Sequence, residues 1–353
     1  WNGIAANTKE FCKSGDVIGI KGRLESSSYD EAEEKIECGM SILIREGSNA
    51  RNFDALHPLI GKYKDQLMFC TDDQKAAHLR NGNINKIVAR AKALGYNLFD
   101  ILQIATLNPV KHYHIPMGLL QAGDSADFII CDNLDDFHPK ATYVNGENVF
   151  DLPYLTAQQE INNFKAKHIS KKDIADSLEG KDCVDVIQVL DNELFTPHLH
   201  VEKKDFDQIQ KVVVLNRYSS EISVGVGYVK GFNIRGGALA QSIAHDSHHL
   251  IATGSSDELI VEALNKLVDM QGGIVVTDGQ QSTTLALPVA GLMSNCPADE
   301  VAAAQQALGD HLQQLQCPLS SPLIALSFLQ LIVIPELKIT DKGLFDVVKF
   351  KYL

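Results

Sequence analysis

The alternation of apolar and polar positions near the start of the chain predicts helices that lead into short buried strands. From 29 to 40 the apolar residues recur three to four positions apart, and a short apolar run from 41 to 44 follows. A second helix-like stretch, 52–63, leads into the apolar run 66–70, which stops at polar residues. The same order of elements therefore occurs twice.

Two more helices are predicted over 84–94 and 98–106. The second is expected to end before Pro109, because the residue before a proline disfavours the helical conformation. Helices and strands in this order indicate a parallel sheet, as in a (β/α)₈ barrel, where polar residues at the strand ends face the active site. Glu46 and Asp72 follow the two predicted strands and are the first candidates for chemistry.

Past residue 116 the pattern changes to short alternating runs, which predict a small β module. Strands are expected over 118–120, 126–131, 142–144 and 147–150. Asn145-Gly146 separates the last two, and this dipeptide is a strong signal for a hairpin turn.

The polar stretch 156–172 is a candidate linker, and a third region begins at about residue 174. That region is long enough to form an α+β domain of its own. Its predicted strands are 184–189, 212–215, 223–229, 273–277 and 284–287, and its predicted helices are 257–270 and 297–315.

Composition narrows the function classes. The net charge of -13 opposes phosphate backbones and anionic lipid surfaces, so we expect neither nucleic acid nor a membrane as a partner. The seven cysteines show no CxxC spacing, which favours free thiols in a reducing compartment. The longest apolar run, 323–335, is too short to span a bilayer. A cytoplasmic location is therefore expected.

Polar residues at the two strand ends are suited to chemistry on a heterocycle. In Thr71-Asp72-Asp73 a carboxylate could bind a metal or take a proton from a metal-activated water. A turn or helix cap explains such an aspartate pair about as well. Arg45-Glu46-Gly47-Ser48 offers a cation, an anion and a hydroxyl that could hold a purine, although the motif alone favours a structural ion pair.

The segment His245-Asp246-Ser247-His248-His249 concentrates imidazoles and a carboxylate between two apolar runs. The preferred interpretation is a polar loop near a substrate pocket. A site for zinc, iron or manganese is the second interpretation, and a solvated turn is the third. Neither a phosphate-binding loop nor a serine-hydrolase Gly-x-Ser-x-Gly motif is present in the sequence.

Several segments, in order along nearly the whole chain, together resemble the adenine deaminase family of metal-dependent amidohydrolases. The matching segments are 39–48 with 50–52, Phe69-Cys70-Thr71-Asp72-Asp73, 105–109, the turn 123–128, Ala244-His245-Asp246-Ser247-His248, 252–254, 287–294 and 341–346. The turn is typical of the amidohydrolase superfamily, whereas the segments of the third region are the most specific to adenine deaminases.

The resemblance implies a fold and its domain boundaries. It implies the C-terminal portion of an amidohydrolase (β/α)₈ barrel over 1–115, a small composite β domain over 116–155 and a C-terminal α+β domain over 174–353, assembled as a homo-oligomer, with a dimer expected. The implied fold class is α/β with a partial barrel.

The resemblance also implies a reaction, the hydrolytic deamination of adenine to hypoxanthine and ammonia by a metal-activated water, in purine salvage. Asp72 matches the family aspartate that binds metal and moves a proton, and Glu46 matches a glutamate near the purine. The implied cofactor is a divalent metal, manganese first, with iron or zinc as alternatives. The residues expected to bind substrate are Arg45, Ser48, Asp73, His245 and His248.

The sequence departs from the family pattern at its metal ligands. The family His-x-His of the first barrel strand has no counterpart before residue 100. Leu24, Lys75 and Asn83 stand where relatives carry histidines. Residues 1 to about 110 also offer two or three strands, whereas a closed barrel has eight. We therefore expect a fragment or decayed copy that lacks a complete metal site, unless another polypeptide supplies the missing half.

Three hypotheses follow. The first is an adenine deaminase whose catalysis needs residues that are not in this sequence. The second is a non-catalytic purine-binding or assembly remnant of the same family, which Leu24, Lys75 and Asn83 favour. The third is another amidohydrolase, such as a sugar deacetylase or a dihydroorotase, against which the segments around His245 and Leu287 argue.

Overall fold

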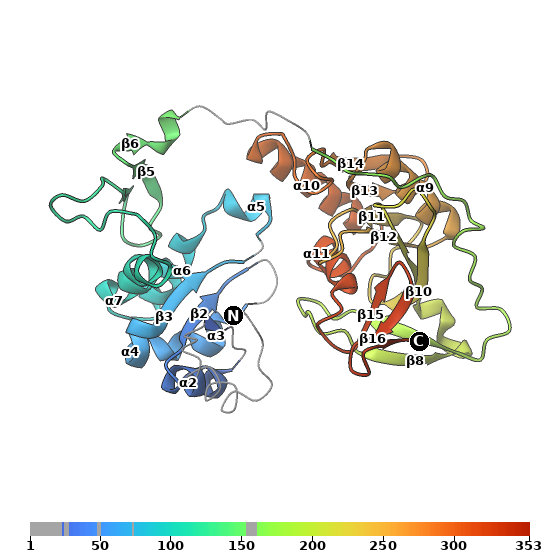
Figure 1. Cartoon of the computed structure of the whole chain (residues 1–353), viewed down its shortest axis with the longest axis horizontal. Coiled ribbons are helices and arrows are strands. Elements are labelled where there is room, and N and C mark those ends of the chain that lie inside the picture. Colours follow the sequence, from blue (N-terminus) through green and yellow to red (C-terminus); the bar gives the residue numbers. More distant parts are fainter. Residues whose placement is uncertain (1–22, 25–27, 48–50, 73, 153–160) are drawn as a thin grey trace. The chain divides into compact units, whose positions relative to one another are not determined.

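A computed structural model describes residues 23–24, 28–47, 51–72, 74–152 and 161–353. The chain divides into two compact units, Trp1–Leu155 and Thr156–Leu353, and each unit is considered by itself. Both mix helices and strands, so the expected α/β class is confirmed at this level (Figure 1).

Unit 1 is built on a parallel three-stranded sheet of order β1-β2-β3. These strands are β1 (Arg23–Leu24), β2 (Ser41–Arg45) and β3 (Leu67–Cys70). Helix α2 (Tyr29–Glu37) joins the first two, and the Ser28 hydroxyl caps it by accepting from the Glu31 N–H. The predicted helix over 52–63 is three short helices, α3 (Phe53–Leu56), η1 (His57–Leu59) and α4 (Ile60–Tyr63).

Helices α6 (Ile84–Ala93) and α7 (Leu98–Leu102) bury Ile87, Val88 and Ile101 in the core of unit 1, together with β2 and β3. The expected helix end before Pro109 is wrong. A π-helical turn, η3 (Gln103–Leu107), is followed directly by α8 (Asn108–Tyr113), and Pro109 lies in its first turn. Proline is tolerated there because N–H groups in a first turn lack intrahelical partners.

The small β module is an antiparallel sheet of β4 (Phe128–Cys131), β5 (Pro139–Val144) and β6 (Glu147–Asn148). The predicted hairpin is confirmed, and both Asn145 and Gly146 have the positive φ of a type I′ turn, 52° and 82°. The predicted strand over 118–120 is wrong. Those residues instead form a loop in which the Asp127 carboxylate accepts from the Gly118 N–H at 2.7 Å.

Unit 2 contains an eight-stranded mixed sheet of order β14-β13-β11-β12-β9-β10-β7-β8. All neighbours are antiparallel except β10 and β7, which are parallel. The strands are β7 (Cys183–Gln188), β8 (His198–Glu202), β9 (Gln210–Leu215), β10 (Val224–Lys230), β11 (Ala238–Gln241), β12 (Leu250–Gly254), β13 (Gly273–Thr277) and β14 (Ser282–Ala286).

Both faces of this sheet are covered, which is why β11, β12 and β13 are buried along their whole length. Helix α9 (Asp257–Asp269) packs on one face through Ile260 and Leu264. The other face is covered by α10 (Ala298–Gln314), α11 (Pro322–Ser327) and the hairpin of β15 (Leu337–Thr340) and β16 (Gly343–Asp346) (Figure 1). The last strand, β17 (Lys351–Tyr352), pairs with β16.

The helices and strands predicted for this region are confirmed within a few residues, but β8, β11, β12, β15, β16, β17 and α11 were not predicted. The linker interpretation of 156–172 is wrong in its second half. Ile169 is buried and Phe164 and Ala166 pack beside it against the core under α9. Residues 153–160 lie outside the described part of the chain. Within that part, no helix has the length and apolar character needed to cross a membrane.

Candidate functional site

Arg45 and Asp72 meet at the carboxyl edge of the parallel sheet in unit 1. Strands β2 and β3 pair with Arg45 opposite Cys70, so both strands end at the same edge. Asp72 follows β3 with a left-handed φ of 57°, which aspartate tolerates better than most residues. Its Oδ2 lies 2.6 Å from Nη1 of Arg45. The structure thus brings these two predicted site residues together.

Glu46 is held at the same edge by an arginine and a backbone amide. Its Oε2 lies 3.0 Å from Nη1 of Arg90, and its Oε1 accepts from the Phe53 N–H at 3.3 Å. The Arg90 guanidinium lies over the Phe53 ring, 4.3 Å from its centroid, and also pairs with Asp54. The Glu46 carboxylate is therefore held in place by a guanidinium that it shares with Asp54.

A cavity of about 240 Å³ opens beside Glu46. The side-chain amide of Gln74 donates to the Glu46 carbonyl at 3.1 Å, while Gln74 Oε1 is buried without a hydrogen-bond partner among the described residues. Burial, with nearby Lys75 and Arg51, lowers the pKa of His78, which favours its neutral form. The cavity is lined by Glu46, Gly47, Arg51, Gln74, His78, Asn81, Gly82, Asn83, Lys86, Ile87 and Arg90.

The volume suits a small heterocycle, because pockets for drug-sized ligands occupy about 300–1,000 Å³. The lining offers a carboxylate, an amide oxygen and an imidazole that is neutral near pH 7, the kinds of group that hydrogen-bond ring nitrogens. Two predicted site residues, Ser48 and Asp73, lie outside the described residues.

The described residues around Asp72 do not fit a metal centre. The Asp72 carboxylate is engaged by Arg45, and in the described part of the chain it belongs to no group of three His, Cys, Asp or Glu side chains close enough to share an ion. Lys75 and Asn83, which the resemblance sets where relatives are expected to carry histidine, lie just before α5 (Ala76–Leu79) and α6.

In unit 2, His245 and His248 lie in the loop between β11 and β12, so the predicted loop is confirmed. Their rings are 5.5 Å apart, and Nδ1 of His248 accepts from the Ala244 N–H at 3.1 Å. Burial, and secondarily His245, lowers the pKa of His248. His248 is thus favoured as a neutral imidazole whose proton is on Nε2.

The neighbouring His249 lies near Asp341, which belongs to another segment that carries the family resemblance. Its Nε2 lies 3.8 Å from Oδ1 of Asp341, and its ring centroid is 5.4 Å from that of Tyr218. Arg217 donates to the Ala290 carbonyl at 2.8 Å. Burial lowers the pKa of His249, and its Nδ1 has no hydrogen-bond partner among the described residues. The segments around 245, 290 and 341 therefore form one polar cluster.

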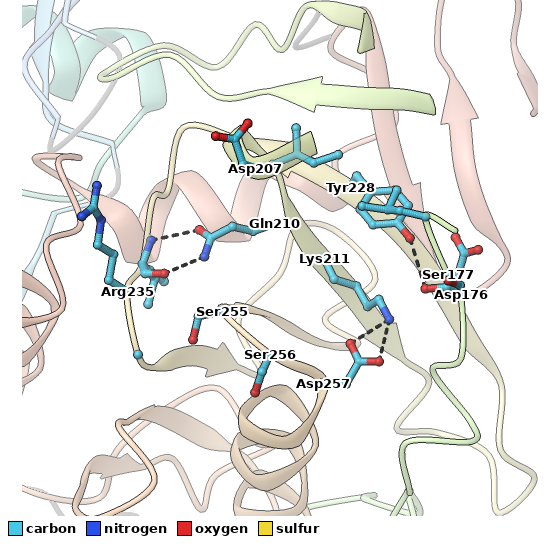
Figure 2. A pocket seen from close by; sticks show the side chains of 15 residues that line it. Asp176, Ser177, Asp207, Gln210, Lys211, Tyr228, Arg235, Ser255, Ser256 and Asp257 are labelled. Carbon is cyan, nitrogen blue, oxygen red and sulfur yellow. Dashed lines mark hydrogen bonds and ion pairs between the residues drawn. The ribbon is translucent and has the colours of Figure 1, made fainter. Parts of the chain in front are cut away.

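A cavity of about 600 Å³ in unit 2 lies elsewhere and is lined by neither His245 nor His248 (Figure 2). Its central charges are paired, with Lys211 Nζ 2.7 Å from Oδ1 of Asp257. The Tyr228 hydroxyl donates to the Asp176 carbonyl at 3.2 Å. Burial raises the pKa of Tyr228, so this phenol stays protonated. The contacts describe a polar cleft in which Lys211 and Asp257 neutralise each other.

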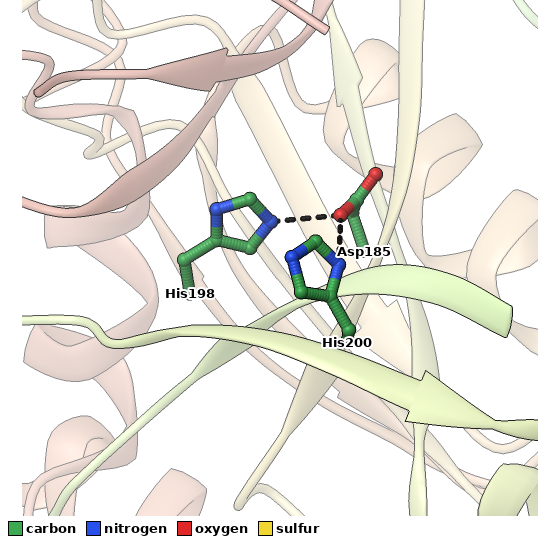
Figure 3. Close-up of side chains that lie close together, drawn as sticks. All are labelled: Asp185, His198 and His200. Carbon is green, nitrogen blue, oxygen red and sulfur yellow. Dashed lines mark hydrogen bonds and ion pairs between the residues drawn. The ribbon is translucent and has the colours of Figure 1, made fainter. Parts of the chain in front are cut away.

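A third cluster, Asp185, His198 and His200, was missed by the sequence analysis. Oδ1 of Asp185 lies 2.8 Å from Nε2 of His198 and 2.8 Å from Nδ1 of His200 (Figure 3). The available signal was the His-x-His spacing, since residues two apart in a strand share a face. Recognising it required a prediction of β8, which the sequence analysis did not make.

Two family models match the chain. The amidohydrolase family model matches residues 20–149, and the adenine deaminase C-terminal domain model matches residues 190–351. The first match includes the strand-end cluster of Arg45, Glu46 and Asp72, and the second includes the histidine loop.

Curated relatives match the chain across both models. The chain is 40% identical to the adenine deaminase of Borreliella afzelii (strain PKo), over 95% of this chain and 64% of that protein. It is 41% identical to the adenine deaminase of Borreliella burgdorferi, over 99% of this chain and 67% of that protein. It is 40% identical to the adenine deaminase of Methanosarcina acetivorans, over 95% of this chain and 65% of that protein. The chain thus spans about two thirds of the length of these relatives.

The matches at this identity are continuous through the strand-end cluster, the small β module and the histidine loop, and the two family models account for both units. Membership of the amidohydrolases also implies dependence on a divalent metal. On this evidence the chain belongs to the adenine deaminase family.

Proposed function

We propose that this chain serves in the hydrolytic deamination of adenine to hypoxanthine and ammonia, a hydrolysis of a C–N bond in a cyclic amidine. The observation that carries the proposal is about 40% identity to proteins named adenine deaminase over 95% or more of this chain. The cavity beside Glu46 supports it, because its size and polar lining suit a purine base.

In the proposed reaction the oxygen of water forms a bond to C6 of adenine, and the bond from C6 to the exocyclic nitrogen breaks. A proton must move from the water to the departing amine. Asp72, at the end of β3, is proposed to carry it, and Glu46 to accept a hydrogen bond from a purine N–H. Arg45 would then hold the Asp72 carboxylate in position, since Nη1 of Arg45 lies 2.6 Å from Oδ2 of Asp72.

Substrate contacts from Ser48, Asp73, His245 and His248 remain part of the proposal. A neutral His248 with its proton on Nε2 could donate one hydrogen bond to a ring nitrogen or a carbonyl oxygen. The divalent metal of the family, with manganese proposed first and iron or zinc as alternatives, would supply activation of the water. It would need donors other than the described side chains around Asp72.

Four finer features belong to the same proposal: a partial (β/α)₈ barrel in unit 1, a role in purine salvage, a cytoplasmic location and a homodimer. The parallel order β1-β2-β3 supports the barrel, and free thiols at the six described cysteines support a reducing compartment. Exposed apolar side chains support further packing partners for unit 1, with Phe99 at 78% and Ile129 at 59% exposure.

A second candidate is a purine-binding or assembly role without turnover. The favouring observation is that the described neighbours of Asp72 provide no metal donor set. This candidate keeps the Glu46 cavity and the histidine loop but assigns no proton transfer to Asp72. It differs from the first in a measurable way, because adenine would bind without release of ammonia.

The test is ammonia release from adenine by the purified chain with added manganese, iron or zinc, beside calorimetric binding of adenine. We expect Asp72→Asn to abolish any metal-dependent turnover while adenine binding changes little, because the substitution removes a proton carrier and keeps the size of the side chain. Glu46→Gln is expected to weaken adenine binding about tenfold to a hundredfold, because a hydrogen bond to a charged group contributes about 1.5–3 kcal/mol.

Asp135→Asn is the matched control, since Asp135 is an exposed carboxylate paired with Lys92. This variant should leave both ammonia release and adenine binding unchanged. Full turnover in Asp72→Asn would remove Asp72 from the mechanism. Adenine binding without ammonia release in the presence of any of the three metals would favour the second candidate. Absence of both adenine binding and ammonia release would contradict both candidate functions.

A further inference from the structure

The cluster of Asp185, His198 and His200 is set by the pairing of two strands at the edge of the sheet in unit 2. Strands β7 and β8 are antiparallel, with Asp185 opposite His200 and Ile187 opposite His198. Residues two apart in a strand share a face, so both imidazoles project on the side where Asp185 projects. The backbone register alone therefore brings three donor side chains together.

The side chains already converge on a small volume (Figure 3). Nε2 of His198, Nδ1 of His200 and a carboxylate oxygen of Asp185 all lie within 4.8 Å of one another. Ligand bonds to zinc measure about 2.0–2.2 Å, so two ligands of one tetrahedral ion lie about 3.3 Å apart. The observed nitrogen–oxygen distances of 2.8 Å need to widen by only about half an ångström.

The surrounding charges favour a cation. The carboxylates of Asp185, Glu336 and Asp346 lie close together at this edge. Oε2 of Glu336 accepts a hydrogen bond from the backbone N–H of His198 at 2.8 Å. The nearby cation, Lys349, is paired with Asp346 at 2.9 Å. The three carboxylates against this one lysine leave an excess of negative charge, which a divalent ion would balance.

Access from solvent is open on one side. The His200 side chain is 70% exposed and that of Asp185 is 37% exposed, whereas His198 is 15% exposed. Strand β8 is the last strand of the sheet, so among the described residues no further strand pairs with its outer edge. An ion could therefore enter and keep water at a remaining coordination position, as in three-ligand sites.

We propose that Asp185, His198 and His200 bind a divalent transition metal ion such as zinc. The bound ion would cross-link the edge strand β8 to its neighbour β7. Two imidazoles and one carboxylate suit this class better than magnesium or calcium, which prefer all-oxygen sites. The proposal uses residues of unit 2 alone and does not rest on adenine deamination. Binding is expected to stabilise unit 2, because an ion held by the folded state alone opposes unfolding.

The experiment is zinc binding to the full chain after removal of metal with a chelator, measured by calorimetry with zinc ions alone. We expect His200→Ala and Asp185→Asn each to weaken one zinc site at least tenfold. His200 is exposed, so its substitution should leave the fold intact. Cobalt offers a second reading, since the absorption of a tetrahedral cobalt site should appear in the unmodified chain and be lost in both variants.

Two controls separate this site from other zinc binding. His168→Ala removes a histidine from a pair with Asp269 that belongs to no group of three possible donors in the described part of the chain, and Asp135→Asn changes an exposed carboxylate of unit 1. Both should retain the affinity of the unmodified chain. Equal zinc affinity and an unchanged cobalt spectrum in His200→Ala and Asp185→Asn would overturn the proposal.

Discussion

At the scale of single residues, Lys338 in β15 shows how burial changes a charge. Its side chain is fully buried and donates to the carbonyls of Leu194 and Phe328 at 3.2 and 3.1 Å. No ion pair with a carboxylate accompanies these bonds in the described part of the chain. Burial lowers the pKa of Lys338 to about 7, so the charged form is disfavoured in the folded state.

This residue should make the stability of unit 2 depend on pH. Below about pH 7 the lysine is protonated in both states, and folding carries the full cost of burying its charge. Between about pH 7 and the ordinary lysine pKa of about 10.4, the unfolded chain binds the extra proton, so the free energy of unfolding rises with pH. The expected slope is roughly 1.4 kcal/mol per pH unit from this group.

Lys338→Met removes that contribution. We expect the variant to gain stability relative to the unmodified chain at pH 6 and to lose this advantage by pH 9, as measured by urea unfolding at each pH. The control is Lys342→Met in the turn of the same hairpin, where the side chain stays exposed. A pH-independent difference for Lys338→Met would contradict the assignment.

Single residues of the candidate site were predictable only by type and position. Arg45, Glu46 and Asp72 could be placed at strand ends from the apolar runs before them. Their partners could not, because Glu46 meets Arg90 and Arg45 meets Asp72 across 44 and 27 positions of sequence. The ion pairs that hold these groups follow from tertiary packing.

At the scale of elements, β10 lies against the β15–β16 hairpin so closely that a side chain cannot fit between them. A Cβ added at Gly225 would lie 1.9 Å from the Thr340 carbonyl oxygen. Backbone atoms cannot yield as a flexible side chain can, so the hairpin would have to move. The glycine therefore sets the distance between the hairpin and the sheet.

Gly225→Ala is expected to destabilise unit 2 by roughly 3 kcal/mol, the upper range for overpacking. The matched control is Gly309→Ala in α10, where an added Cβ meets nothing within 4 Å. Alanine is favoured over glycine in a helix, so this control should stabilise by about 0.5–1 kcal/mol. Thermal unfolding of both variants tests the pair, and equal effects would refute the close-approach argument.

Elements with strong periodicity, such as α6, α9 and α10, were predictable because one face of each packs on a sheet. Strands β11 and β12 were not predicted, since they lack alternation and also lack the run of β-branched residues that made the equally buried β13 predictable. The end of α7 was misjudged because a proline in the first turn of α8 continues a helical segment that it would otherwise terminate.

At the scale of the whole molecule, the two units have separate apolar cores. The core of unit 1 includes Leu56 on α3, whereas the core under α9 in unit 2 includes Leu264, and the described core clusters do not share residues across the two units. Each unit can therefore lose its packing without directly removing apolar contacts in the core of the other.

Calorimetric unfolding should accordingly show two transitions. We expect Leu56→Ala to lower one of them and Leu264→Ala the other, each by an amount corresponding to roughly 2–5 kcal/mol. The double variant should show both shifts added together. A single transition lowered by either substitution would show that the units unfold together.

The sequence by itself determined the family resemblance, the α/β class, the periodic helices and the hairpin at Asn145-Gly146, because these depend on local spacing and on backbone conformations of individual residues. Tertiary structure alone decided the eight-stranded order of unit 2, the cavity beside Glu46 and the meeting of Asp185 with His198 and His200. Strand order and cross-strand register bring distant residues together, and no local pattern encodes which strands become neighbours.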